Sequence, residues 1–148
     1  MRFATPTLRL TEAQHRRIVG HCYDGLPDEA CGLLAGPVIA GEPTGAVSAV
    51  YPCHNADASA RTYTVDSRDL IKAMRDAESR GEELVGVFHS HTHTDPYPSD
   101  TDVRQALEPG WVHVLVSLKH GEPALRAYRI RDGEIAEVPV VLEGTSYQ

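Results

Sequence analysis

The stretch of sequence that decides the fold covers residues 84–102 and reads LVGVFHSHTHTDPYPSDTD. Its first part, residues 84–88, is a nearly unbroken apolar run, which is typical of a central strand buried on both faces. Pro96 and Pro98 then interrupt extended structure, and Ser99 has the residue type of a helix N-cap. This stretch therefore predicts a buried strand, a polar loop and the start of a short helix.

Two histidines and an aspartate in this stretch have the spacing of metal ligands. Residues i and i+2 of a strand point to one face, so His89 and His91 can present two imidazoles together. Ser99 and Asp102 are three positions apart and are neighbours on one helical face. Two imidazoles and one carboxylate form a catalytic zinc set, with the fourth position left for water. The pattern predicts one zinc ion per chain, bound by His89, His91 and Asp102.

Simpler explanations exist for each of these residues alone. A single histidine is more often a surface or satisfied core residue than a ligand, and Ser99-x-x-Asp102 is also the capping-box pattern of a helix start. The combination at fixed offsets, in the strand–loop–helix context that it requires, favours the metal site. His93 shares the parity of the two ligand histidines, but the prolines that follow favour a solvent-facing loop position for it.

The rest of the chain predicts one mixed α/β domain over residues 1–148, with a mixed β-sheet flanked by helices. A helix of about 13 residues is expected after the N-cap Thr11, and a second helix opens at Asp66 or Ser67. The short helix after the prolines is expected to reach about Leu107. Strands are expected at 7–10, 29–35, 46–51, 62–65, 84–88, 112–118, 124–130 and after Gly133.

Composition and charge argue against several classes of function. The formal net charge of −7 at pH 7 disfavours a nucleic acid partner, because proteins that bind phosphate backbones usually carry a basic patch. No apolar run approaches the length of a membrane span, and the N-terminal residues lack the apolar stretch of a secretory signal. The three cysteines, Cys22, Cys31 and Cys53, form no disulfide framework, so we expect a cytoplasmic protein.

The motif resembles that of the JAMM (MPN+) metallopeptidases. The upstream glutamate of that family is matched within residues 27–34, which read PDEACGLL. The family positions that are filled are Glu29, His89, His91, Ser99 and Asp102. The resemblance implies the JAB/MPN fold, which is cytidine-deaminase-like, and zinc as the cofactor. One departure is Thr92, which stands where many members have proline and makes the loop geometry harder to predict.

The resemblance also implies chemical roles. Bound zinc would lower the pKa of its water toward about 7 and polarise the scissile carbonyl. Glu29 matches the general base that passes the proton of this water to the leaving amine, whereas the local sequence alone favours a surface carboxylate. Ser99 matches the donor of a hydrogen bond to the tetrahedral oxyanion; the alternative is a helix cap alone. Cys31 shares strand parity with Glu29 and is expected to pack rather than to line the site.

The sequence of residues 28–32, DEACG, and the short chain look most like the bacterial branch of the family, which acts on ubiquitin-like sulfur-carrier proteins. This likeness implies hydrolysis of the bond after the C-terminal Gly-Gly of such a carrier, with release of cysteine. The extended tail could lie along a sheet edge.

Three alternative functions stay open. The first is a general isopeptidase or processing protease for ubiquitin-like modifiers. The second is a non-catalytic MPN scaffold, although scaffold relatives lose metal ligands and none is missing here. The third, a DNA-repair-associated relative, is disfavoured by the acidic charge. A homodimer is compatible with the sequence.

Overall fold

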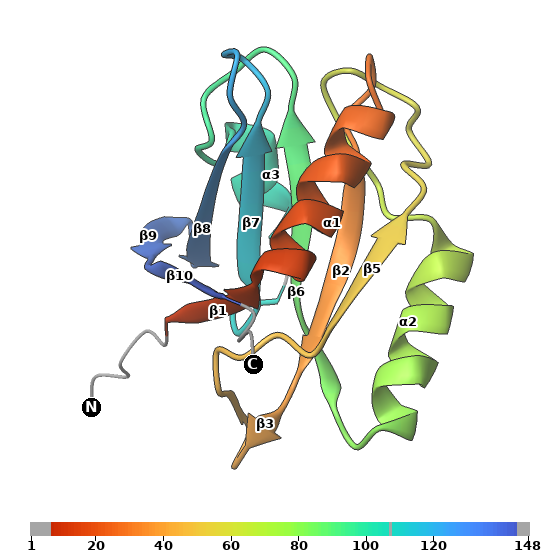
Figure 1. Cartoon of the computed structure of the whole chain (residues 1–148), viewed down its shortest axis with the longest axis vertical. Helices are drawn as coiled ribbons and strands as arrows, with labels where there is room; N and C mark the ends of the chain where they lie inside the picture. The colour runs from red at the N-terminus through yellow and green to blue at the C-terminus, as the bar shows by residue number, and fades with distance from the viewer. Residues whose placement is uncertain (1–6, 107, 145–148) are drawn as a thin grey trace.

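The computed structural model describes residues 7–106 and 108–144. Its centre is a six-stranded sheet with the strand order β5-β2-β6-β7-β8-β9 (Figure 1). The six strands are β2 Cys31–Gly36, β5 Ala49–Cys53, β6 Glu83–His91, β7 Val112–Ser117, β8 Ala124–Arg131 and β9 Glu134–Val138. The β6–β7 pair is parallel and the other neighbours are antiparallel, so the sheet is mixed.

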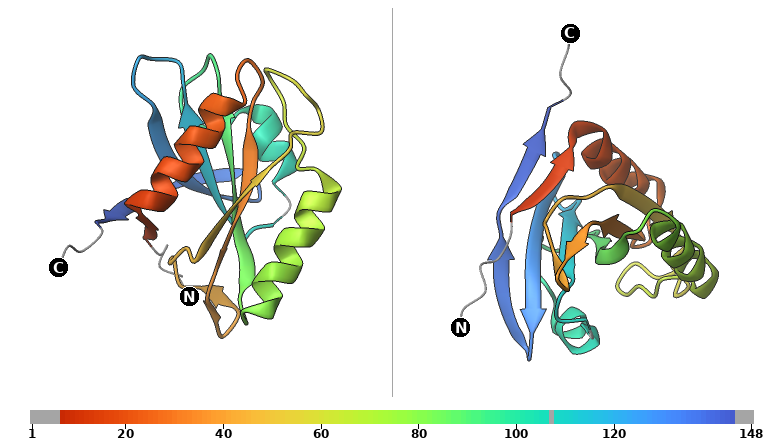
Figure 2. Two further views of the ribbon diagram at one scale, coloured as in Figure 1. Left: turned by 45° about the vertical axis from the view of Figure 1, so that its right-hand side comes forward. Right: turned by 90° about the horizontal axis from the view of Figure 1, so that it is seen from below.

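Two long helices pack on this sheet, one on each face. Helix α1, Glu12–Asp24, starts at a capping box between Thr11 and Gln14, and its buried residues join the apolar cluster on one face. Helix α2, Ser67–Ser79, is capped by the Asp66 side chain and packs against the other face (Figure 2). A mixed α/β fold with a sheet flanked by helices is thus confirmed, and both helices start where the sequence predicts.

Strand β6 is buried on both faces, as expected for a central strand. Phe88 joins the cluster that includes α1, while Val87 joins the cluster that includes α2. The strand continues beyond the apolar run as far as His91, because β2 pairs with it at His89 and β7 pairs with it as far as His91. This extension brings both histidines into regular strand geometry, so their side chains share one face.

The expected strand at 62–65 is wrong. Apart from an isolated bridge between Asn55 and Val65, this segment pairs with no strand among the described residues. The Asn55 side chain bonds to two backbone groups of this segment: its amide donates to the carbonyl of Thr62 and its oxygen accepts from the N–H of Thr64, while the Thr64 carbonyl accepts from the N–H of Ala56. A single side chain thereby satisfies backbone groups that would otherwise need a ladder.

Smaller elements complete the fold. Strand β1, Leu8–Thr11, pairs in parallel with β10, Val140–Glu143, so the strand expected after Gly133 is in fact two, β9 and β10 (Figure 2). Strands β3 Val38–Ile39 and β4 Glu42–Pro43 form a hairpin. Helix α3 spans Asp100–Gln105; its expected end near Leu107 lies outside the described residues. Among the described helices, none has the length and apolar character that a membrane crossing requires.

Candidate metal centre

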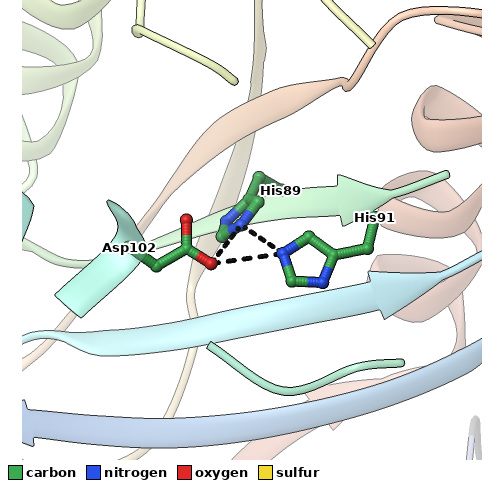
Figure 3. A group of neighbouring side chains, drawn as sticks. All are labelled: His89, His91 and Asp102. Carbon is green, nitrogen blue, oxygen red and sulfur yellow. Dashed lines mark hydrogen bonds and ion pairs between the residues drawn. The ribbon is translucent and has the colours of Figure 1, made fainter. Parts of the chain in front are cut away.

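The end of β6 and the start of α3 bring three side chains to one point (Figure 3). The Nε2 atoms of His89 and His91 are 3.2 Å apart. Oδ2 of Asp102 lies 3.3 Å from the first and 3.2 Å from the second. The two histidines are 1% and 4% exposed, so this group lies within the protein rather than on a solvated surface.

The spacing and chemistry of the three atoms fit one zinc ion. Atoms that bind a tetrahedral zinc at about 2.0–2.1 Å lie about 3.3–3.4 Å from one another, close to the separations observed. Two imidazole nitrogens and a carboxylate oxygen that face a single point direct their lone pairs toward it, and a cation is the group that such an arrangement stabilises.

The backbone of the following loop defines the protonation of His91. Its Nδ1 lies 2.8 Å from the carbonyl oxygen of Asp95. A carbonyl can only accept a hydrogen bond, so Nδ1 carries the proton and donates it, and Nε2 keeps a free lone pair. Metal-binding histidines are usually held by a contact of this kind at the second ring nitrogen.

The first turn of α3 holds the carboxylate of Asp102. The Ser99 hydroxyl accepts from the Asp102 N–H at 3.1 Å, and Asp102 Oδ2 accepts from the Ser99 N–H at 2.9 Å. Burial opposes ionisation of Asp102, but the contacts with His89 and His91 and the hydrogen bond from the Ser99 N–H outweigh it and hold the pKa of this carboxyl well below its usual range. The capping box is therefore real, and it also orients the carboxylate toward the two imidazoles.

Glu29 is buried beside this centre, so the surface position that its local sequence favours is wrong. Only 6% of the residue is exposed. Burial raises the pKa of Glu29 to about 7, with the carboxylates of Asp102 and Asp57 adding to the effect and His91 opposing it. In the metal-free protein this carboxyl group therefore holds its proton more tightly than an exposed glutamate does.

Ser90 and Tyr63 support the site, and the sequence motif identified neither of them in this role. Ser90 is fully buried between the two candidate ligands His89 and His91, and its hydroxyl accepts from the N–H of Ala30 at 2.8 Å. The ring of Tyr63 stacks on that of His89, with centroids 4.2 Å apart. A serine within a strand does not by itself indicate a supporting role in a site. The contact of Tyr63 depends on how a loop remote in sequence folds.

The remaining residues singled out from the sequence lie outside this group. His93 is exposed in the loop after β6, as expected. Cys31 is a free, buried thiol that packs with Leu33 and Val87, which confirms its packing role. Burial raises the pKa of the Cys31 thiol to about 12. The Thr92 hydroxyl donates to the carbonyl of Ala60 at 3.2 Å and so ties the loop to the neighbouring segment.

Comparison with known proteins places this arrangement in a family. Residues 11–131 match the profile of Prok-JAB, the prokaryotic homologs of the JAB domain. The chain belongs to this family. The match covers both long helices and the whole of the candidate metal centre, and it ends within the central sheet at the last residue of β8.

Several relatives of this JAB-domain protein are peptidases. The chain is 43% identical over 124 residues to the CysO-cysteine peptidase of Mycobacterium tuberculosis. The aligned region covers 83% of this chain and 82% of that protein. It is 33% identical over 131 residues to the desampylase of Haloferax volcanii, and this alignment covers 85% of this chain and 89% of the desampylase.

A solved structure has a similar fold. The solution structure of protein DSY2949 from Desulfitobacterium hafniense superposes with a TM-score of 0.84 at 31% identity, and the superposition covers 94% of each chain.

Proposed function

We propose that this JAB-domain protein is a zinc-dependent peptidase that hydrolyses the bond after the C-terminal Gly-Gly of a ubiquitin-like sulfur-carrier protein and releases cysteine. The observation that carries the proposal is the convergence of His89, His91 and Asp102 at 3.2–3.3 Å separations. The substrate follows from the similarity to the CysO-cysteine peptidase. The scaffold alternative is disfavoured because the full ligand set is present.

The three ligand side chains would hold the metal, and Glu29 would move the proton. Zinc in such a site supplies a water of lowered pKa and a Lewis acid for the scissile carbonyl. Glu29 is buried beside these side chains, and its carboxylate is the group there that can take a proton and give it to the leaving amine. The leaving amine of a cysteine adduct is its α-amino group, which must gain a proton to depart.

Ser99 would stabilise the developing oxyanion while it still caps helix α3. Its oxygen accepts the hydrogen bond from the Asp102 N–H, so the hydroxyl proton stays available for a second contact. Ser99 is exposed at the edge of the metal centre, where a substrate carbonyl can reach it. Donors of this kind typically contribute a factor of about 10²–10³ to turnover.

Mass spectrometry of the substrate tests the proposal. A carrier–cysteine adduct is incubated with zinc-loaded enzyme, with chelated enzyme and with the Glu29→Gln variant. We expect the adduct to lose the mass of one cysteine residue with the zinc-loaded enzyme alone. An adduct that keeps its mass with fully zinc-loaded enzyme would contradict the proposed reaction.

Removal of whole modifier proteins from isopeptide conjugates is the second candidate. The similarity to the desampylase of Haloferax volcanii favours it, although the identity to the CysO-cysteine peptidase is higher. The same metal centre serves both reactions, which differ only in the leaving amine. Equal amounts of carrier–cysteine adduct and isopeptide-linked conjugate, offered together, distinguish them: the proposal expects the adduct to be consumed first.

We also propose that the protein acts in the cytoplasm. The three cysteines, Cys22, Cys31 and Cys53, are free and buried. Cys31 and Cys53 are partners in the β2–β5 ladder, and a reducing compartment keeps such neighbouring thiols from forming a disulfide. Cell fractionation with an antibody to the protein tests this location.

A further inference from the structure

The second ring nitrogen of His89 has no partner among the described residues. Its Nδ1 is buried and forms no hydrogen bond, whereas Nδ1 of His91 donates to the Asp95 carbonyl. Because Nε2 of His89 faces His91 and Asp102, the proton of a neutral His89 ligand must reside on Nδ1. A buried N–H donor without an acceptor destabilises the folded state, so a hydrogen-bond acceptor is expected next to this atom.

His113 carries a matching unpaired atom on the neighbouring strand. It pairs with Val87 in the parallel β6–β7 ladder, two residues before His89, so alternation places His113 and His89 on the same face. Its Nε2 is buried and likewise forms no hydrogen bond with the part of the chain that the structure describes. Tyr63, whose ring stacks on His89, lines one small pocket together with His113 and Val87.

His113 is suited to accept a hydrogen bond. The residue is 7% exposed, and this burial is the largest cause that lowers the pKa of His113 to about 4. A neutral imidazole offers one nitrogen as a donor and the other as an acceptor. With the proton on Nδ1, the buried Nε2 of His113 has a free lone pair.

We propose that His113 is a positioning residue for the metal ligand His89, through one internal water molecule that accepts from His89 Nδ1–H and donates to His113 Nε2. Internal waters commonly satisfy buried polar groups in this way. The inference rests on the proposed function in one respect only, that His89 is a zinc ligand. The contact would fix the ring plane and tautomer of His89, as the Asp95 carbonyl does for His91. Loss of such supporting contacts typically weakens metal binding about 10–100-fold.

Zinc affinity of His113 variants tests the proposal without any need for a substrate. Zinc dissociation constants are measured by competition with a chromophoric chelator for the wild-type protein, His113→Leu and His113→Gln. We expect His113→Leu to bind zinc about 10–100-fold more weakly. His113→Gln, whose side-chain amide can still accept, should stay within a few-fold of the wild type.

A packing control separates positioning from general loss of stability. Val114 is fully buried on the opposite face of β7; Val114→Ala should destabilise the fold and leave zinc affinity unchanged. Equal zinc affinity of His113→Leu and the wild type, or equal weakening in His113→Leu and His113→Gln, overturns the inference.

A crystal structure of the zinc-loaded wild-type protein provides the second measurement, which does not depend on any variant folding. We expect one water within hydrogen-bond distance of both His89 Nδ1 and His113 Nε2. Ordered density for the two rings with no such water overturns the inference and leaves the proposed function intact. A wild-type protein that binds no zinc contradicts the proposed function itself.

Discussion

The hydroxyl of Ser90 accepts a hydrogen bond of 2.8 Å from the N–H of Ala30, and the N–H of Ser90 donates at 3.0 Å to the Ala30 carbonyl. Ser90 stands between the two proposed ligand histidines, and Ala30 directly follows the proposed base, Glu29. These two bonds therefore join the segment that carries the proposed base to the strand that carries two of the proposed metal ligands.

Replacement of Ser90 by alanine tests this connection. The Ala30 N–H would remain buried without its acceptor, which typically costs about 1–3 kcal/mol. We expect Ser90→Ala to lose stability of that order in urea unfolding, to bind zinc, and to turn over more slowly because Glu29 is held less firmly. Ser79→Ala, which removes an exposed hydroxyl on α2, is the control and should behave as the wild type.

Glu29→Gln should separate metal binding from proton transfer. The side chain keeps its shape but cannot take a proton, so turnover should fall by roughly 10²–10⁴-fold with full zinc content by metal analysis. A variant that retains wild-type turnover would show that another group is the base.

The same substitution should change stability in a pH-dependent way. Burial raises the pKa of Glu29 from 4.5 to about 7 in the metal-free folded protein. A raised carboxyl pKa stabilises the fold at pH below 4.5 and loses that contribution as pH rises through 7. Metal-free Glu29→Gln should therefore be more stable than the wild type at pH 8 and lose this advantage toward pH 4, as measured by thermal unfolding.

Ser99 carries two roles that different replacements separate. Ser99→Ala removes the cap and the proposed oxyanion donor, so it should cost about 1 kcal/mol of stability and about 10²–10³-fold in turnover. Ser99→Thr keeps a hydroxyl that can cap and donate, and both quantities should stay near wild-type values. If Ser99→Ala loses stability but no turnover, Ser99 is a helix cap alone.

Loss of Asp102 should abolish zinc binding. Because Asp102→Ala removes one of three ligands, we expect negligible zinc in the purified variant and no change in its melting temperature on addition of chelator. The wild type should melt at a lower temperature with chelator, since bound metal stabilises the folded state. Asp100→Ala on the same helix turn is the control, because Asp100 is exposed, and it should bind zinc fully.

His113 should make the metal-free fold sensitive to mild acid. Its pKa is lowered from 6.5 to about 4 by burial, so its neutral form stabilises the fold fully above pH 6.5, and this contribution declines as pH falls toward 4. The wild type should lose up to about 3 kcal/mol relative to His113→Gln across this range. Parallel stability curves for the two proteins between pH 7 and pH 4 would contradict this assignment.

The sequence predicts local features of this fold, such as helix starts, better than it predicts which strands pair with one another. Helix α1 begins directly after Thr11, because the capping residues act within a few positions of the helix they start. The segment 62–65 has the composition of a strand but pairs with no described strand, since the Asn55 side chain bonds to the Thr62 carbonyl and the Thr64 N–H instead. The parallel β1–β10 pair joins residues from opposite ends of the chain, and no local pattern encodes such a contact.

In the candidate site, too, the residues within one short stretch are predictable from the sequence and the long-range contacts are not. The positions of His89, His91 and Asp102 follow from strand and helix periodicity within one short stretch, so the motif predicts them. Glu29 was linked to them only by family resemblance, because its place depends on the β2–β6 pairing. The contacts of Ser90, Tyr63 and His113 depend on segments that are remote in sequence, and only the folded structure brings them together.

The parallel pair of β1 and β10 has a consequence for synthesis of the protein. Leu8 and Leu10 of β1 are 3% and 0% exposed in the folded protein, yet their strand partner at 140–143 is synthesised after every other described helix and strand. A nascent chain that already carries both long helices still presents one unpaired edge of β1. Pairing of β1 with β10 therefore has to wait for a strand made much later, and truncation before residue 140 should yield a chain that chaperones retain.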